Sequence, residues 1–477
     1  MKTTFLGLAM TVWAAGQTNQ VKLPPYAREV LPNGAVLCLL PKHDAPLLDL
    51  RAVIRGGAES DPAGLAGLSS VVAELLRHGT STRTADQFAE ELDQIGASFG
   101  TYVNAQRTAV SAEVLPEYAG RMIDLLADAV LRPTFPEPEV QKVLAQSIEA
   151  SRSWKDSLRT AAWQYFRPFY FGPRHPYGRP LWGDELTLRR MARPLIADHH
   201  ERMYVGANLT LIAVGNFETP EMRARLAQAF GQMPAGQAYQ WVADSPVDRP
   251  KGPRLLLVDK PEATQTHFLI GFPGIHRTHP NRIAVWLVNN IFGGRFTSLL
   301  NQELRVNAGL TYGAYSSLNL NRLTGAIVIS SFTATGTTAQ AIDLALNVLK
   351  RFGRNRISAT QLASAKAYIK GSYAPENLQT AEQFAALLAN LELFGLDREV
   401  IDDLYSRIDA VTLDQANAAV KKYFRADDLN FVLVGNASRI REAVRKYAPQ
   451  MMEISIAEPG FELKDAKWQR TRPGRQR

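Results

Sequence analysis

The stretch ANLTLIAVGN at residues 207–216 decides the fold, because the chain contains it twice. Its second copy is DLNFVLVGN at residues 428–436. Each copy is an apolar run that predicts a buried strand, and each ends in Gly-Asn after a helical segment that closes on an aromatic residue. The two Gly-Asn pairs begin at residues 215 and 435, which are 220 positions apart.

A second repeat has nearly the same spacing. ASFGTY at residues 97–102 corresponds to LTYGAY at residues 310–315, with the central glycines 213 positions apart. Solenoid repeats have much shorter periods, of about 20–50 residues. The sequence therefore predicts two large homologous domains rather than an array of small repeats.

The boundary between the two domains is expected at residues 236–253, where proline and glycine are frequent. This boundary divides the chain into five expected parts. They are a signal peptide (1–16), an N-terminal domain (22–235), a linker (236–253), a C-terminal domain (254–452) and a basic tail (453–477).

The predicted elements are strands followed by helices in each half. In the first half, Asn33-Gly34 between apolar residues predicts a hairpin, and a strand follows at 48–55. Amphipathic helices are expected near 67–78, 84–95, 115–131 and 137–157. The second half predicts strands at 254–259, 266–272, 311–318 and 323–331, with helices at 281–292 and 297–306. The fold class is α+β, with two homologous domains, each a mainly antiparallel sheet covered by helices.

Composition and charge exclude several classes of protein. Of the 477 residues, 46% are hydrophobic and 21% are charged, which is typical of a globular protein and not of a fibrous or disordered one. The net charge of +8 comes largely from five basic residues after residue 465, Lys467, Arg470, Arg472, Arg475 and Arg477. The rest of the chain gives no support to a nucleic-acid partner. Cys38 is the only cysteine, which excludes a disulfide framework and a multi-cysteine metal site.

The first 16 residues are typical of a secretory signal peptide. Lys2 precedes an apolar run at 5–15 that ends in small residues. That run is too short to span a bilayer, which takes about 20 residues, although a buried strand or a membrane anchor is the alternative. We expect a periplasmic or secreted protein with no integral membrane segment.

The helix expected at 67–78 has an apolar side and an opposite side that carries Ser70, Ala73 and Glu74. Its core stripe is Leu68, Val71, Val72, Leu75 and Leu76. Together with Gly67 before it and Gly79-Thr80 after it, this frame resembles the metal helix of the pitrilysin or insulinase group of zinc peptidases, which includes the mitochondrial processing peptidase. In that family the helix carries H-x-x-E-H, in which two histidines bind zinc and the glutamate activates water.

The sequence departs from this motif at its functional positions. Ser70, Ala73 and Glu74 stand where the family has His, Glu and His. Ser70 and Ala73 cannot replace an imidazole ligand and a general base, and a catalytic zinc usually has three protein ligands. The resemblance places a third ligand on the helix at 137–157, where Glu149 is the nearest candidate. We expect no metal in this chain, although weak affinity at Ser70 and Glu74 stays open, and we interpret Glu74 as a partner of Arg77 or His78.

The eight histidines do not form another metal motif. They are His43, His78, His175, His199, His200, His267, His276 and His279, and no two of them have HxxxH or HxxEH spacing. His199 and His200 are adjacent, so on a helix their side chains point in different directions. His276 and His279 flank a loop, where spacing alone does not predict a site.

The second half matches the family at a different element. LRVNAGLTY at residues 304–312 fits the family pattern R-x-x-x-G-L-x-Y. We expect Arg305 in the last turn of a helix that Gly309 ends, and Tyr312 on the following strand. The resemblance implies that Arg305 binds a carbonyl of the substrate peptide and that Tyr312 stabilises the oxyanion. Without the family, Arg305 would only complement the helix dipole and Tyr312 would only fill a strand position.

Two functions remain as hypotheses. The resemblance implies half of a clam-shell chamber: a non-zinc-binding subunit of a heterodimer that supplies Arg305 and Tyr312 to unstructured peptides at the zinc of a homologous partner. The alternative is a structural or peptide-binding homologue with no proteolytic role, like the core subunits of respiratory complexes.

Overall fold

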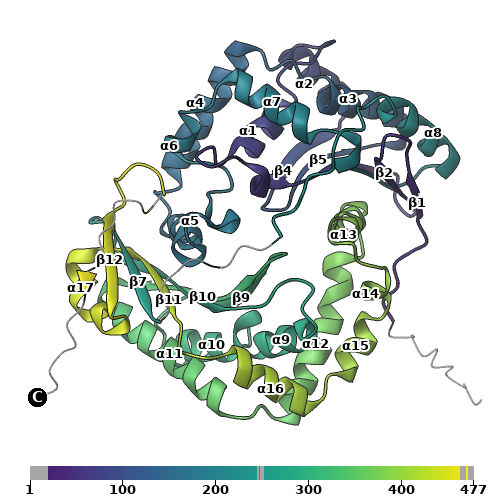
Figure 1. The fold of residues 1–477 in the computed structure, drawn as a ribbon. Helices are drawn as coiled ribbons and strands as arrows, with labels where there is room; N and C mark the ends of the chain where they lie inside the picture. The colour runs from purple at the N-terminus through teal and green to yellow at the C-terminus, as the bar shows by residue number, and fades with distance from the viewer. Residues whose placement is uncertain (1–19, 244–246, 248–251, 462, 464–468, 471–477) are drawn as a thin grey trace, which may run out of the picture.

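The computed structural model describes residues 20–243, 247, 252–461, 463 and 469–470 (Figure 1). The expected signal peptide and parts of the expected linker and tail lie outside these residues. The chain forms two domains that each contain one sheet, and the outer surfaces of both are covered by helices. The α+β prediction is confirmed.

The first sheet has the order β1-β2-β6-β3-β5-β4. The β2-β6 pair is parallel and the other pairs are antiparallel. Its strands are β1 (Ala27–Val30), β2 (Val36–Pro41), β3 (Leu48–Arg55), β4 (Ser98–Val103), β5 (Arg107–Val114) and β6 (Leu209–Gly215). The predicted hairpin at Asn33-Gly34 joins β1 to β2, and Gly34 adopts a left-handed φ of 88° at this turn.

The second sheet has the order β13-β12-β7-β11-β8-β10-β9. Its strands are β7 (Arg254–Asp259), β8 (Gln265–Pro273), β9 (Ala314–Leu320), β10 (Gly325–Ala334), β11 (Asn430–Gly435), β12 (Gln450–Ser455) and β13 (Gln469–Arg470). The run β7-β11-β8-β10-β9 repeats β2-β6-β3-β5-β4 strand for strand, including the parallel first pair. The repeated Gly-Asn stretches are the equivalent strands β6 and β11, so the predicted duplication is confirmed.

Helices pack on both sheets, most of them on the outer faces (Figure 1). In the first half they are α1 (Leu68–Leu75), α2 (Ala85–Gln94), α3 (Ala119–Leu131), α4 (Glu137–Ser153), α5 (Leu158–Phe171), α6 (Glu185–Leu188), α7 (Arg193–Met203) and α8 (Thr219–Phe230). In the second half they are α9 (Arg282–Asn289), α10 (Leu299–Asn301), α11 (Thr338–Arg354), α12 (Ala359–Asn377), α13 (Ala381–Phe394), α14 (Glu399–Asp402), α15 (Leu404–Ala410), α16 (Leu413–Tyr423) and α17 (Ala437–Val444).

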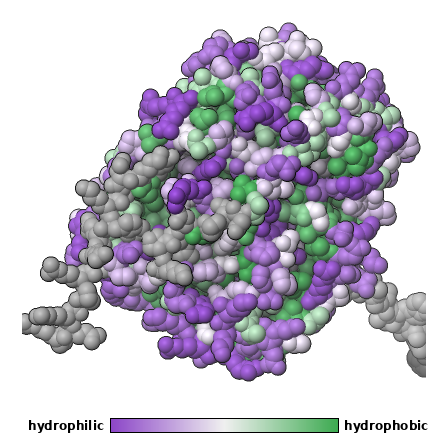
Figure 2. Space-filling model, viewed as in Figure 1, coloured by the Kyte–Doolittle hydropathy of each residue, from purple (hydrophilic) through white to green (hydrophobic). Residues whose placement is uncertain are grey.

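The two domains exchange one helix each. Helix α5 packs against β8 and β11 of the second sheet, so closely that a side chain at Gly271 would meet the Phe166 ring at 2.4 Å. Helix α13, which lies 223 positions later in the chain, packs against β3 and β6 of the first sheet. Each sheet is therefore buried on its inner face by a helix from the other half. In Figure 1, α5 and α13 lie between the two sheets, and Figure 2 shows hydrophobic residues along the same zone.

A buried ion pair also joins the halves. Glu59, whose side chain is 0% exposed, accepts a 2.8 Å hydrogen bond from Arg322 in the turn between β9 and β10. Arg322 also donates to the Val242 carbonyl at 2.6 Å, and its guanidinium lies over the Trp241 ring. The described part of the expected linker, which has no helix or strand, is thus fixed at the domain junction.

The expected start of the basic tail at residue 453 falls inside β12, which continues to Ser455. Beyond it, Phe461 is 0% exposed and packs edge-on against Tyr165 of α5 at 5.0 Å between ring centroids. Residues 453–461 therefore belong to the folded domain, because their apolar side chains complete the core around α5.

Candidate functional site

Helix α1 is positioned by a buried carboxylate. Asp61 accepts hydrogen bonds from the backbone N–H groups of Gly67 and Ser69, both at 2.8 Å. Gly67 has a φ of 92°, and a side chain there would collide with the backbone of Gly183 at 2.4 Å. Burial raises the pKa of Asp61 to about 6, against the lowering effect of these hydrogen bonds. The helix begins at Leu68, one residue after the expected 67, and ends at Leu75, three residues before the expected 78.

Residues 181–183 close over the face of α1 that carries the motif positions. The Ser70 hydroxyl donates to the Leu181 carbonyl at 2.9 Å. Ala73 is 1% exposed and packs with Ala58, Val103 and Leu181. The position of the first zinc ligand therefore holds the Ser70 hydroxyl, which is already hydrogen-bonded, and the position of the general base holds the apolar side chain of Ala73.

Glu74 has the structural role that its spacing predicts. Its carboxylate pairs with Arg77 at 2.5 Å and lies 3.5 Å from His78. The hydrogen bond to Glu74 is the main cause that raises the pKa of His78, and His78 also contacts Glu139 on α4 at 2.8 Å. This chain of contacts ties α1 to α4.

Glu149 does not approach the motif positions. Its side chain is 69% exposed and pairs with Arg152 on its own helix. A cavity of about 380 Å³ lies beside Ser70 and Glu74, and α4 lines it with Gln146 and Ser147 instead. Within the described residues there is no group of three or more His, Cys, Asp or Glu side chains that could hold a metal ion. The donor set does not fit zinc.

The adjacent histidines on α7 are buried and point apart, as predicted. His199 contacts the Ser69 hydroxyl at 3.2 Å, whereas His200 contacts the Val130 carbonyl at 2.9 Å. Burial lowers the pKa of both imidazoles to about 4. His276 and His279 do meet, with ring centroids 5.2 Å apart, but within the described chain no third ligand joins them.

Restoring the family motif in α1 is expected to damage the fold without creating a zinc site. In the triple variant Ser70→His, Ala73→Glu, Glu74→His, the carboxylate introduced at position 73 would enter an apolar cluster, at a cost of several kcal/mol, about 2–5. Elemental analysis should find no stoichiometric zinc, and thermal unfolding should occur at lower temperature. Glu74→His alone, on the half-exposed side, is the control and should keep the stability. A stable triple variant with one zinc per chain would contradict this account.

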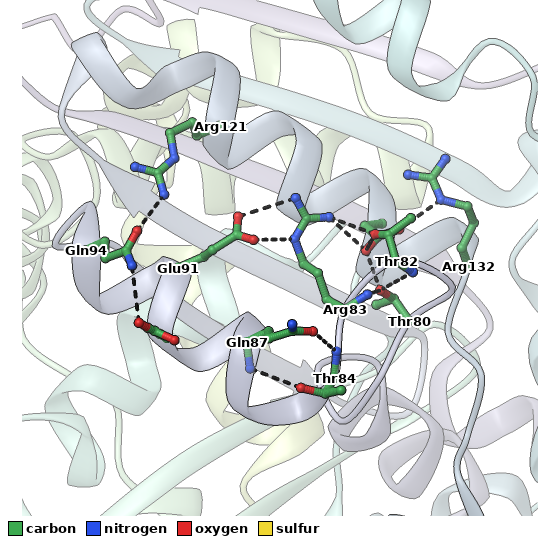
Figure 3. A network of polar contacts seen from close by, with 11 residues as sticks. Thr80, Thr82, Arg83, Thr84, Gln87, Glu91, Gln94, Arg121 and Arg132 are labelled. Carbon is green, nitrogen blue, oxygen red and sulfur yellow. Dashed lines mark hydrogen bonds and ion pairs between the residues drawn. The ribbon is translucent and has the colours of Figure 1, made fainter.

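The Gly79-Thr80 part of the family frame has a structural role. The Thr80 hydroxyl donates to Asp128 on α3, a carboxylate with 0% exposure that also accepts from Thr82 at 2.7 Å and Arg132 at 2.8 Å (Figure 3). Arg83 joins this carboxylate to Glu91 on α2. Burial acts to raise the pKa of Asp128, but these hydrogen bonds outweigh it and lower the value. This part of the frame therefore connects the segment after α1 to helices α2 and α3.

The segment around Arg305 forms the predicted helix, but the strand after it begins later than predicted. Helix α10 continues as a π-helical turn, Gln302–Asn307, and Gly309 ends it with a left-handed φ of 61°. Tyr312 was expected on the following strand, and this is wrong: it lies in a bend two residues before β9 begins at Ala314. A bend forms because the Thr311 hydroxyl bonds with both the N–H and the carbonyl of Gly313. The Tyr312 side chain is thereby left 76% exposed.

Arg305 and Tyr312 lie together. The Arg305 guanidinium is 4.7 Å from the centroid of the Tyr312 ring and also 4.7 Å from that of Phe296. Phe296, which is 56% exposed, is the residue that sequence reasoning missed. Among the described residues, neither the guanidinium nor the phenol hydroxyl forms a hydrogen bond. Both therefore keep all their donors for a ligand.

Arg305, Tyr312 and Phe296 form a group that we call the Arg305 cluster. This cluster and the motif positions do not form one site within this chain. No hydrogen bond, ion pair or shared cavity joins Arg305 or Tyr312 to Ser70, Ala73 or Glu74 in the described structure. No helix in the described part of the chain is both long and apolar enough to cross a bilayer.

These features define a duplicated α+β chain with peptidase architecture and a metal helix that cannot hold its metal. Comparison with known proteins agrees with this class. The profile of the insulinase family, peptidase family M16, matches residues 40–168, and that of the peptidase M16 inactive domain matches residues 191–369. The chain belongs to the insulinase family and lacks its zinc motif.

Similar proteins include both zinc proteases, by name, and a non-peptidase. An uncharacterized zinc protease of Mycobacterium leprae is 27% identical, over 76% of this chain and 81% of its own length. A non-peptidase homologue of Helicobacter pylori, YmxG, is 22% identical over 91% of this chain and 97% of its own. Among solved structures, the peptidase M16 inactive domain from Pseudomonas fluorescens has a TM-score of 0.80 at 23% identity, covering 86% of this chain and 98% of that one. A protease from Helicobacter pylori has a TM-score of 0.79 at 17% identity, covering 87% and 100%.

Proposed function

We propose that this chain is the non-zinc-binding subunit of a heterodimeric insulinase-like metallopeptidase. The chain is exported, its partner is a homologous subunit that holds the zinc, and the substrates are unstructured peptides. The observation that supports this most is the Arg305 cluster, because a guanidinium between two exposed rings, with all its hydrogen bonds unused, is prepared for a ligand from outside the chain.

In this proposal the two side chains have different tasks. The planar guanidinium of Arg305 donates two hydrogen bonds to a backbone carbonyl of the peptide. The Tyr312 hydroxyl donates to the oxygen on which negative charge develops during cleavage. Their separation from the motif helix of their own chain supports action at a site on a second subunit.

The test is peptide cleavage by the purified chain, alone and mixed with a zinc-bearing paralogue. Loss of a single oxyanion donor lowers kcat by about 100- to 1,000-fold, so Tyr312→Phe should reduce kcat of the complex by that amount. Arg305→Ala should mainly raise KM, because it removes a contact to the substrate in both the ground state and the transition state. The chain alone should not cleave.

A matched control lies in the same domain. Arg295 lies over the ring of Tyr368, which is 46% exposed, at 5.6 Å. Tyr368→Phe should leave cleavage unchanged, since Tyr368 lies outside the family pattern at residues 304–312. Full activity of Tyr312→Phe and Arg305→Ala complexes would refute the assigned roles.

The name of the Helicobacter pylori relative favours a second candidate, a structural or peptide-binding homologue without proteolytic function. This candidate predicts that no mixture with a zinc-bearing paralogue cleaves peptides. It also predicts a stable complex whose formation does not depend on Arg305 or Tyr312.

A further inference from the structure

A cavity of about 420 Å³ lies at the junction of the two domains. It is enclosed by α9, α12, α13 and β9. Its walls combine polar and apolar surface in similar amounts, and the apolar part includes the side chains of Trp286, Tyr373, Leu318, Leu387 and Leu396. A cavity of this size accommodates one or two amino-acid residues rather than a long ligand.

Two arginines line this cavity without a carboxylate partner. Within the described chain, neither Arg277 nor Arg282 forms an ion pair. The Nε atom of Arg277 is fully buried and has no hydrogen-bond partner, and its guanidinium lies 4.7 Å from the Phe394 ring. Burial lowers the pKa of both arginines, and neighbouring arginines lower it further. The cavity thus contains uncompensated positive charge.

Two further arginines have a buried Nε atom without a hydrogen-bond partner, and one of them contacts a residue that lines the cavity. Arg107 donates to Asn390, which lines the cavity, at 3.0 Å, and its Nε is also buried without a partner. Burial lowers the pKa of Arg167 on α5 to about 10, and its Nε is unpartnered too.

Three other half-buried arginines of the chain do have a carboxylate partner. Arg51, Arg83 and Arg322 each lie against a carboxylate at 2.8–3.0 Å. Withdrawing a cation from water without a counter-charge is costly, so such groups are normally paired. An anionic ligand would supply the missing charge here.

The cavity also presents an acceptor. Asn290 lines it, and its Oδ1 atom is buried with no hydrogen-bond donor nearby. A ligand that satisfies the whole cavity therefore combines a carboxylate, an N–H group close to that carboxylate, and an apolar body. The last residue of a peptide has all three, whereas a fatty acid lacks the N–H and an inorganic anion lacks the apolar body.

We propose that this cavity binds the C-terminal residue of a peptide, with its carboxylate held by Arg277 and Arg282, its amide N–H donating to Asn290, and its apolar side chain against Trp286 and Tyr373. This goes beyond the proposed peptidase role, because it requires neither a partner nor a metal. It assigns the cavity a preference for peptides that end in an apolar residue.

The test uses the full-length chain alone and three probes in calorimetric titrations: the hexapeptide Gly-Ser-Gly-Ser-Ala-Leu as free acid, the same peptide as C-terminal amide, and decanoate. The free acid should bind at least tenfold more tightly than the amide, since charge-assisted hydrogen bonds contribute about 1.5–3 kcal/mol each. It should also bind more tightly than decanoate. Trp286 fluorescence should change on binding, as the side chain contacts the ligand.

Arg277→Gln and Arg282→Gln should each weaken binding of the free acid about tenfold or more while leaving thermal stability unchanged or higher, because they remove buried charges that have no partner. Arg356→Gln is the control: this arginine is 71% exposed, pairs with Asp414 and lies outside the cavity. Equal affinity for acid and amide, no saturable binding of the acid, or unchanged binding by both cavity variants would overturn the proposal. Tighter binding of decanoate than of the peptide acid would overturn the assignment to peptides.

Discussion

Replacing Arg322 by alanine is expected to lower the free energy of unfolding by about 3–5 kcal/mol, the usual cost of removing one partner of a buried ion pair. The cause is Glu59, whose fully buried carboxylate would lose its only ion-pair partner among the described residues. Urea denaturation of the purified chain measures the change.

The effect should depend on pH and on the charge of Glu59. Burial already raises the pKa of Glu59 against the opposing effect of Arg322, so removing the arginine raises it further. The loss of stability in Arg322→Ala should therefore be largest at neutral pH and should shrink as the pH falls and Glu59 takes up a proton. Adding Glu59→Gln should recover part of the loss for the same reason.

An exposed pair provides the comparison. Arg425 and Asp427 are 64% and 59% exposed, and Arg425→Ala should change the stability by about 1 kcal/mol at most. Equal effects of Arg425→Ala and Arg322→Ala would show that the Glu59 pair does not fix the domain junction.

The second large effect is expected at Phe461. Phe461→Ala should cost about 3–5 kcal/mol, as for other fully buried phenylalanines. Its ring packs against Tyr165 and Trp154, Lys155 lies over it, and its N–H donates to Asp184 at 3.0 Å. The substitution would leave a cavity between α5 and β12, which chemical denaturation would detect.

Truncations separate the folded part of the C-terminus from the rest. A chain that stops after Met452 loses half of β12 and Phe461, and we expect it to be insoluble or unfolded. A chain that stops after Leu463 keeps these contacts and should unfold within about 1 kcal/mol of the full chain. If the shorter chain were equally stable, residues 453–461 would not be part of the core.

The sheets were predictable because their central strands are continuous apolar runs. The Gly-Asn repeat identified β6 and β11, and the strand at 48–55 agrees with β3 at both ends. Strand β4 was missed as a strand because it lies at the sheet edge, where every second residue is exposed and only Phe99 and Val103 on the other face are apolar. Helix α5 was missed because it is apolar on nearly all sides, and a buried helix has no amphipathic pattern to read.

The residue types of the candidate site could be predicted from the sequence, but the contacts between its residues could not. Loss of the zinc ligands follows from the residue types at positions 70, 73 and 74 alone. That Leu181 covers Ser70 and Ala73 depends on a contact between residues more than 100 positions apart, for which the sequence carries no signal. The contact of the Arg305 guanidinium with the Phe296 ring was missed for a different reason, because it depends on a local turn between two short helical segments.

The exchange of α5 and α13 has a mechanical consequence. Swinging the two domains apart about residues 236–253 would pull both helices out of apolar contacts and break the Glu59–Arg322 pair. We therefore expect the two domains to move together as one unit. In the proposed heterodimer, any gate that opens to admit a peptide would then lie at the boundary between this chain and its partner.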